Sequence, residues 1–318
     1  MFRRAKILAI LVILFLTAQP AHAFWIWTPE SNKWENPKYS VKGTPSEQLE
    51  YASQIYQTKD YDAAIREFRK LIKHYPKARE APEAQFYIGA CYEDLGNLQQ
   101  AFKEYQIIVD KYPFSERSGE VVSKQFNIGE RLLEGAQNRS KFVDALAGAN
   151  YTVIDIFKTV IKNAPYGSLA PQAQYKIGLY LLEKGLYQES RDEFEKVIND
   201  YPESEWAKGA KYQIALADSK RSAGAAYDQK ITQAAAEEFK EFVEIYPDAE
   251  LSPAAREQIN ALKEKEAENN FLIAQFYQKQ KNYKAANLYY QVVVDDYAQT
   301  KWAAEALKAI PEVTGKIK

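Results

Sequence analysis

The feature that most constrains the fold is a helix-pair pattern that returns six times and ends in Tyr-Pro or a degenerate form of it. The clear copies are Tyr75-Pro76, Tyr112-Pro113, Tyr201-Pro202 and Tyr246-Pro247, and the degenerate ones are Asn163-Ala-Pro165 and Tyr297-Ala298. Pro76 and Pro113 are 37 residues apart, as are Pro165 and Pro202. Periods of this length are typical of stacked helical hairpins, not of a single globular core.

The copies share one register. If Gly89 is position 8 of a 34-residue unit, position 20 is Ala101, position 24 is Tyr105 and position 32 is Pro113. This spacing matches the tetratricopeptide repeat (TPR), which has small residues at 8 and 20, an aromatic ring at 24 and a helix-ending Pro at 32. Position 24 is aromatic in every copy: Phe68, Tyr105, Phe157, Phe194, Phe239 and Tyr290. The sequence therefore predicts an all-α TPR solenoid of about six helix-turn-helix repeats, with these rings buried.

Three stretches depart from the regular array. Asn138 to Asn150 is an insertion in repeat 3, and repeat 5 carries a second, shorter insertion. Leu251 to Glu268 predicts an added charged helix before repeat 6. Thr44 and Ser252 each precede a Pro, as helix N-caps do, and strand signals are almost absent.

The N-terminus has the pattern of an export signal. Three basic residues precede the apolar run from Ile7 to Leu16, which is too short to span a bilayer as a helix. Ala21 and Ala23 are the small residues that a signal peptidase requires, so we expect cleavage after Ala23 and a periplasmic protein. An uncleaved anchor is the alternative. The predicted segments are 1–23 (signal), 24–43 (extended, aromatic), 44–170 (repeats 1–3), 171–310 (repeats 4–6) and 311–318 (tail).

Composition argues against several functions. Without residues 1–23 the chain has 39 basic and 43 acidic residues, a net charge of −4, and it has no basic block of the kind that binds nucleic acid. One His (His74) and one Cys (Cys91) remain, in different repeats, which cannot form a zinc site or a catalytic triad. We therefore expect no cofactor, no metal and no enzymatic activity.

A ligand of a TPR array is expected on the concave face, at positions 2, 5, 9 and 12 of each first helix. These positions include Leu49, Tyr56, Phe86, Ala90, Phe126 and Tyr175. Such an apolar, aromatic groove would suit an extended peptide with aromatic or aliphatic side chains. The alternative is that the side chains pack against one another in a tightly wound superhelix.

Three Trp residues, Trp25, Trp27 and Trp34, lie in the N-terminal extended segment. They are expected to fold back and cover the exposed end of repeat 1, as terminal repeats often require. The alternative location is a membrane interface, where Trp is favoured.

The C-terminal third resembles a known family. The residues that carry the resemblance are Gln233–Phe239, Phe242–Pro247, Leu262–Glu268, Ile273–Tyr277 and Tyr289–Tyr297, in this order and spacing. Together they resemble the outer-membrane β-barrel assembly factor D family (BamD, also called ComL or YfiO). The resemblance implies a periplasmic scaffold that docks on the barrel-forming assembly component (BamA-like) and helps to receive unfolded outer-membrane proteins.

The resemblance also implies a docking residue, because a basic residue in the long helix before the last repeat is associated with docking in the family. Lys265 aligns with it here. Family members are usually acylated on a Cys after the signal peptide, whereas no Cys lies near Ala23, so we expect membrane association through partners. The alternative function is a cell-envelope coordinator like the periplasmic TPR protein of the Tol-Pal system. Such proteins usually carry an N-terminal coiled coil, and residues 24–43 contain no heptads.

Overall fold

The computed structural model describes residues 25–28, 33–36, 40–137, 152–222 and 229–317. The predicted signal peptide with Ala21 and Ala23, and the insertion Asn138–Asn150, lie outside the described residues. The chain forms two compact units, residues 1–117 and 118–318, each of which is described by itself. The grouping of repeats at residue 170 is a different division and stays a prediction.

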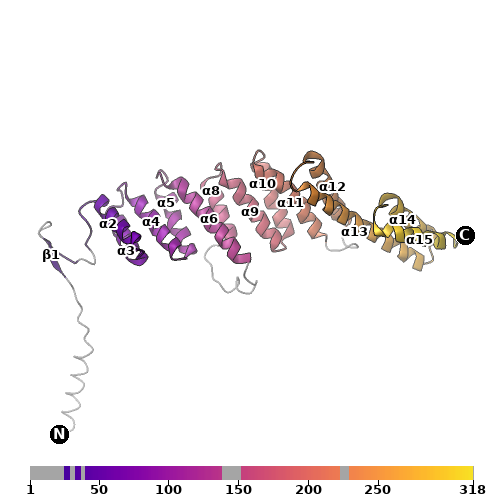
Figure 1. The fold of residues 1–318 in the computed structure, drawn as a ribbon, viewed down its shortest axis with the longest axis horizontal. Coiled ribbons are helices and arrows are strands. Elements are labelled where there is room, and N and C mark those ends of the chain that lie inside the picture. The colour runs from indigo at the N-terminus through magenta and orange to yellow at the C-terminus, as the bar shows by residue number, and fades with distance from the viewer. Residues whose placement is uncertain (1–24, 29–32, 37–39, 138–151, 223–228, 318) are drawn as a thin grey trace, which may run out of the picture. The chain divides into compact units, whose positions relative to one another are not determined.

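The first unit holds a β-hairpin and repeats 1 and 2. Its elements are β1 (Ile26–Thr28), β2 (Lys33–Glu35), α2 (Pro45–Gln57), α3 (Tyr61–His74), α4 (Ala81–Asp94) and α5 (Leu98–Lys111). Consecutive helices pack side by side as antiparallel hairpins (Figure 1). Thr44 caps α2 as expected, because its hydroxyl accepts a hydrogen bond from the Glu47 N–H at 3.2 Å.

The second unit continues the same arrangement through repeats 3 to 6. Its helices are α6 (Ser118–Gln137), α8 (Val153–Asn163), α9 (Leu169–Glu183), α10 (Tyr187–Asp200), α11 (Glu205–Arg221), α12 (Gln229–Ile245), α13 (Ser252–Lys279), α14 (Tyr283–Asp296) and α15 (Lys301–Thr314). Apart from the short hairpin, the regular structure of the described residues is helical, which confirms the all-α TPR fold.

The predicted ring at position 24 is the centre of each repeat. All six rings are at most 1% exposed. In repeat 4 the Phe194 ring lies so close to Gly178 that a Cβ there would be 2.6 Å from the Phe194 Cε1 atom, and Gly89 has the same relation to Tyr105. The small residue at position 8 therefore admits the ring between the two helices of a hairpin.

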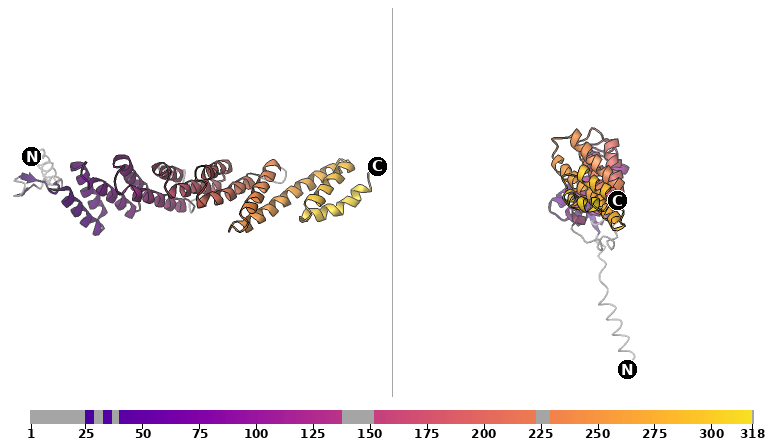
Figure 2. Two further views of the ribbon diagram at one scale, coloured as in Figure 1. Left: turned by 90° about the horizontal axis from the view of Figure 1, so that it is seen from above. Right: turned by 90° about the vertical axis from the view of Figure 1, so that its right-hand side faces the viewer.

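The added helix and the last repeat are organised differently from the prediction. α13 is one uninterrupted helix of 28 residues, which joins the expected helix 251–268 to the first helix of repeat 6. No Pro or Gly interrupts the sequence, and the buried stripe of Ala267, Phe271 and Ala274 continues across the expected break. In Figure 2, α13 (orange) runs past α12 and then along α14 and α15.

Two smaller corrections concern helix ends. Ser252 does not cap α13, because its hydroxyl donates to the Tyr246 carbonyl at the end of α12, and the N-cap is Leu251. The predicted tail 311–318 is helical to Thr314, since Val313 is fully buried against the last repeat.

The N-terminal segment is a β-hairpin where no strand was expected. β1 and β2 pair antiparallel, with Trp27 opposite Trp34. Trp25, Trp27 and Trp34 are 56%, 43% and 63% exposed, so the expectation that they are buried as a cap on repeat 1 is wrong. The two rings that face each other are in contact instead, with centroids 5.8 Å apart.

Among the helices of the described residues, none combines the length and the apolar character that crossing a bilayer requires.

The ring at position 24 gives a direct test of the core. Phe194→Ala should lower the free energy of unfolding by about 3–5 kcal/mol, because a fully buried ring is replaced by a cavity. Urea denaturation followed by circular dichroism measures this. Phe114→Ala is the control: Phe114 is fully exposed, so its loss should change stability by no more than about 0.5 kcal/mol. Equal effects of both substitutions would contradict the repeat register.

Candidate functional site

The predicted concave groove is mostly closed. Phe86, Ala90, Phe126 and Tyr175 are 6%, 9%, 2% and 8% exposed, so the expectation that they are open to a ligand is wrong. Leu49 and Tyr56 are half-buried and pack against the core of the first unit. The alternative, in which these side chains pack against one another, describes the structure better.

The physical reason is a second aromatic layer. The residue at position 5 of five repeats packs its ring on the position-24 ring of the same repeat. The centroid distances are 5.5 Å for Phe86–Tyr105, 5.6 Å for Phe126–Phe157, 5.2 Å for Tyr175–Phe194, 5.5 Å for Tyr212–Phe239 and 5.4 Å for Phe271–Tyr290. Aromatic pairs at these distances stabilise beyond the area that they bury. Position 5 therefore belongs to the core.

A third side chain, 31 residues further along the chain, covers the position-5 ring in three repeats. The Arg117 guanidinium lies 4.5 Å from the Phe86 ring centre, and the Trp206 and Trp302 rings lie 5.1 Å from those of Tyr175 and Phe271. Each covering residue comes from the start of a later helix, as Trp206 and Trp302 do, or from the segment just before one, as Arg117 does. The packing of these residues on the position-5 rings thus covers the side chains that the sequence predicted to be open to a ligand.

A pocket of about 360 Å³ lies beside Tyr175, between α9, α11 and the segment before α13. Tyr175, Trp206, Gly209 and Leu251 give it an apolar, aromatic lining, and the charged residues Glu205, Lys208 and Glu250 also line it. We call this the Tyr175 pocket. Its size and lining are those of a site for one apolar side chain, with charges that can engage the backbone or neighbours of a bound peptide.

Two details define the interior of the Tyr175 pocket. The Tyr175 hydroxyl accepts a hydrogen bond from Gln213 Nε2 at 3.3 Å, and burial raises the pKa of Tyr175, which keeps the hydroxyl protonated. A Cβ at Gly209 would lie 3.2 Å from the Tyr175 hydroxyl. Any side chain at position 209 would therefore narrow the pocket.

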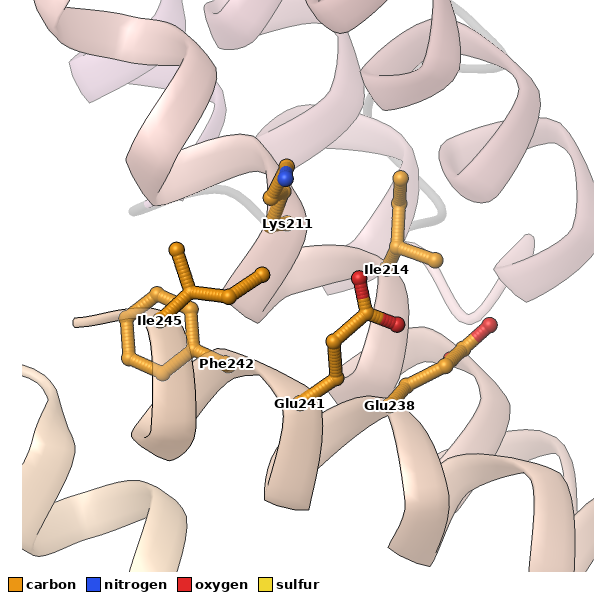
Figure 3. Close-up of a pocket in the computed structure, with 6 residues that line it drawn as sticks. All are labelled: Lys211, Ile214, Glu238, Glu241, Phe242 and Ile245. Carbon is orange, nitrogen blue, oxygen red and sulfur yellow. The ribbon is translucent and has the colours of Figure 1, made fainter. Parts of the chain in front are cut away.

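A second, smaller pocket of about 120 Å³ lies between α11 and α12 (Figure 3). Its residues are Lys211, Ile214, Glu238, Glu241, Phe242 and Ile245. Figure 3 shows the two carboxylates on one side and the Phe242 and Ile245 side chains on the other. The ammonium groups of Lys208 and Lys211 lie 5.4 and 5.7 Å from the centre of the Tyr246 ring. Lys208 lines the Tyr175 pocket and Lys211 lines the smaller one, so both pockets adjoin Tyr246.

A charge cluster adjoins the smaller pocket. Arg191 of α10 donates to Asp218 and Glu238, both at 3.0 Å, and it also donates to Glu195. Burial raises the pKa of Glu238, although the hydrogen bond from Arg191 lowers it. The cluster ties α10, α11 and α12 together, so Glu238 has a structural partner before any ligand binds.

Sequence reasoning missed a buried polar contact that recurs in three repeats. Gln85 Nε2 donates to the Glu104 carbonyl at 3.0 Å and to its carboxylate at 2.8 Å. The same pair of contacts joins Gln48 to Glu67 and Gln174 to Glu193. In each case the two residues are 19 positions apart. This Gln–Glu spacing was the available signal, and it marks packing between the helices of a hairpin.

Lys265, the expected docking residue, is engaged inside the second unit. Its ammonium group donates to the Ser222 carbonyl and, at 3.0 Å, to the Ser222 hydroxyl, and burial lowers its pKa. It therefore satisfies backbone at the C-terminal end of α11. Leu272 and Phe276, seven and eleven residues further along α13, fall on the same helical face as Lys265 and are exposed. A docking role for Lys265 stays a prediction.

No group of three or more His, Cys, Asp or Glu side chains among the described residues is arranged to hold a metal ion. Cys91 is fully buried in α4, and burial raises its pKa to about 12. The thiol is thus a packed side chain of the first unit.

Comparison with known proteins gives matches to parts of the chain. The sequence model of the YfiO family, described as outer membrane lipoprotein, matches residues 217–316. Two tetratricopeptide repeat models match residues 56–116 and 172–204. No curated protein matches the sequence significantly. The matches support a TPR protein whose C-terminal third is similar to the YfiO family, and TPR repeats are typical of scaffolds for protein–protein interaction.

Solved structures with a similar fold are TPR proteins of low sequence identity. The C-terminal part of a TPR protein from Cytophaga hutchinsonii is 17% identical, with 83% of this chain and 88% of that chain covered and a TM-score of 0.37. A TPR protein from Parabacteroides merdae is 15% identical, with 85% and 98% covered and a TM-score of 0.34.

The burial of Cys91 predicts slow thiol chemistry. With a pKa near 12, only about one thiol in ten thousand is ionised at pH 8, and reagents cannot reach it. A chromogenic disulfide reagent should therefore label less than one equivalent over minutes in the native protein and one equivalent in denaturant. Rapid labelling of the native protein would show that α4 is less well packed than the structure has it.

The raised pKa of Glu238 predicts a pH dependence. Because the folded protein holds this proton more tightly than the unfolded chain, the group contributes stability below its unfolded pKa and loses that contribution as pH rises through its folded pKa. Relative to Glu238→Gln, the unsubstituted protein should therefore become less stable as pH rises above about 4, the ordinary pKa of a Glu side chain. Thermal unfolding at several pH values measures this. Glu241→Gln, an exposed carboxylate of the same pocket, is the control, and a constant difference for Glu238→Gln would contradict the prediction.

Proposed function

We propose that the protein is a non-enzymatic periplasmic scaffold in the assembly of outer-membrane β-barrel proteins. One observation carries the proposal. The YfiO family match spans residues 217–316, which include α12, α13, α14 and α15, and in this part of the chain the long helix α13 extends the first helix of repeat 6. In this proposal the scaffold binds the barrel-forming assembly component and unfolded client peptides.

The Tyr175 pocket supports client binding. Its aromatic and apolar lining suits one aromatic or aliphatic side chain of an extended peptide, which is the kind of ligand predicted for the closed groove. Lys208 and the two glutamates at its edge can engage polar groups of the client backbone. We therefore propose that client peptides bind at the Tyr175 pocket, and not along the whole groove that the sequence predicted.

The exposed face of α13 supports the second role. Leu272 and Phe276 are four residues apart on one helical face that also carries Lys265. A partner protein that covers these two neighbouring apolar side chains would bury the kind of small apolar centre on which protein interfaces depend. We assign this face to the barrel component.

The alternative, an envelope coordinator like the periplasmic TPR protein of the Tol-Pal system, has less support. The described part of the segment before the repeats is a β-hairpin, where such a protein would carry a coiled coil.

Separate variants of the two surfaces test the proposal. Gly209→Leu should fill the Tyr175 pocket and lower recovery of unfolded client by about tenfold or more, as loss of an anchoring side chain does. Recovery of the barrel component should be unchanged. Leu272→Ser with Phe276→Ser should give the opposite pattern. Affinity capture from crosslinked envelopes measures both.

The control is Gly119→Leu, at a position where a Cβ meets nothing within 4 Å. Depletion of the protein should also lower the amounts of outer-membrane barrel proteins. Recovery of peptidoglycan-associated proteins without the barrel component would favour the Tol-Pal-like alternative and contradict the proposal.

A further inference from the structure

The N-terminal hairpin presents three Trp side chains on one face. Trp27 and Trp34 are directly opposite each other across β1 and β2, and their rings meet at 5.8 Å with planes 63° apart. Trp25 lies one residue before β1 and two residues before Trp27. Side chains two residues apart in an extended chain point to the same face, so Trp25 is on the face of Trp27. We call these three residues the Trp face.

The Trp face is open to solvent, unlike the other Trp residues of the chain. Its rings are 43% to 63% exposed. Trp206 and Trp302 are instead half-buried and pack on Tyr175 and Phe271. Three adjacent exposed indoles are a large apolar surface for a hairpin with strands of three residues, and such patches mark interaction sites.

The position of the hairpin in the chain indicates a lipid surface as the partner of the Trp face. The apolar run that is predicted to enter the membrane during export ends at Leu16, and Trp25 follows nine residues later. Nine residues reach at most about 30 Å when fully extended, which is comparable to the thickness of the bilayer core. As long as the chain is attached to this run, the hairpin therefore lies within reach of the lipid surface at which it is exported.

The chemistry of indole fits this location. Trp has a broad apolar ring and one N–H donor, and it is enriched at the level of the lipid headgroups, where one end of the side chain is apolar and the other is hydrated. A mature net charge of −4 gives no general attraction to anionic lipids, so the apolar surface must supply the binding.

We infer that the Trp face is a membrane contact that inserts Trp25, Trp27 and Trp34 into the headgroup region of a phospholipid bilayer. The contact holds the N-terminal end of the chain at the lipid surface and adds to any attachment through partner proteins. This inference does not depend on the proposed role in barrel assembly.

The test is binding to vesicles of uncharged phosphatidylcholine. It uses the chain from Phe24 onward, because residues 1–23 would enter a bilayer by themselves. The protein should float with the vesicles, and the triple variant Trp25→Ser, Trp27→Ser, Trp34→Ser should bind at least about tenfold more weakly, since binding scales with the apolar surface that is inserted. Circular dichroism should show the same helix content in both proteins.

A matched control and a second measurement complete the test. Phe114→Ser with Tyr166→Ser removes two fully exposed aromatic side chains of the helical array and should leave vesicle binding unchanged. Brominated phosphatidylcholine should quench Trp emission of the unsubstituted protein, and it should leave the emission of Trp206 and Trp302 in the triple variant unquenched.

Three outcomes would overturn the inference. They are failure of the unsubstituted protein to bind uncharged vesicles, equal binding by the triple variant, and sedimentation with peptidoglycan sacculi in place of flotation with lipid.

Discussion

The contact between a small residue at position 8 and a buried ring at position 24 is the interaction on which the rest of the structure depends. In repeat 4 Phe194 occupies the space above Gly178, Tyr175 packs on Phe194, and Trp206 from the next hairpin packs on Tyr175. Each repeat with this arrangement uses a residue of its neighbour to complete its core, so a single hairpin would leave its ring layer exposed to water. The same layering buries Phe86, Phe126 and Tyr175, three of the residues at which the sequence predicted an open groove.

Polar side chains in the array serve the same structural purpose. The buried Gln–Glu pairs, such as Gln85 with Glu104, satisfy a carboxylate and a backbone carbonyl between the helices of a hairpin, where an unpaired polar group would be costly. Arg191 similarly neutralises Asp218 and Glu238 at the junction of three helices. The surfaces that we propose for partners lie where the repeat is irregular: the pocket before α13, the face of α13 and the N-terminal hairpin.

The sequence predicted the core because the spacing of small and aromatic residues within one repeat determines it. It did not predict the closure of the groove, since burial of Phe86, Phe126 and Tyr175 depends on residues that lie about one repeat away or across an insertion. The hairpin was missed because strands of three residues are too short for an alternating pattern to be recognised. Lys59 and Lys281 adopt positive φ at the position where Gly96 and Gly185 do so in other repeats, and nothing in their residue type indicates that turn.

The length of α13 explains why its Leu272 and Phe276 side chains are exposed. In repeat 2, Tyr87 at position 6 stacks on Phe68 of the preceding hairpin at 5.3 Å, and Cys91 at position 10 is fully buried. The same positions of repeat 6 are Leu272 and Phe276, and both are exposed. The first half of α13 occupies the place where a preceding hairpin would end, and the described residues leave Leu272 and Phe276 exposed there. In the proposed function, the partner protein that binds this face supplies the apolar layer that a preceding hairpin supplies in repeat 2.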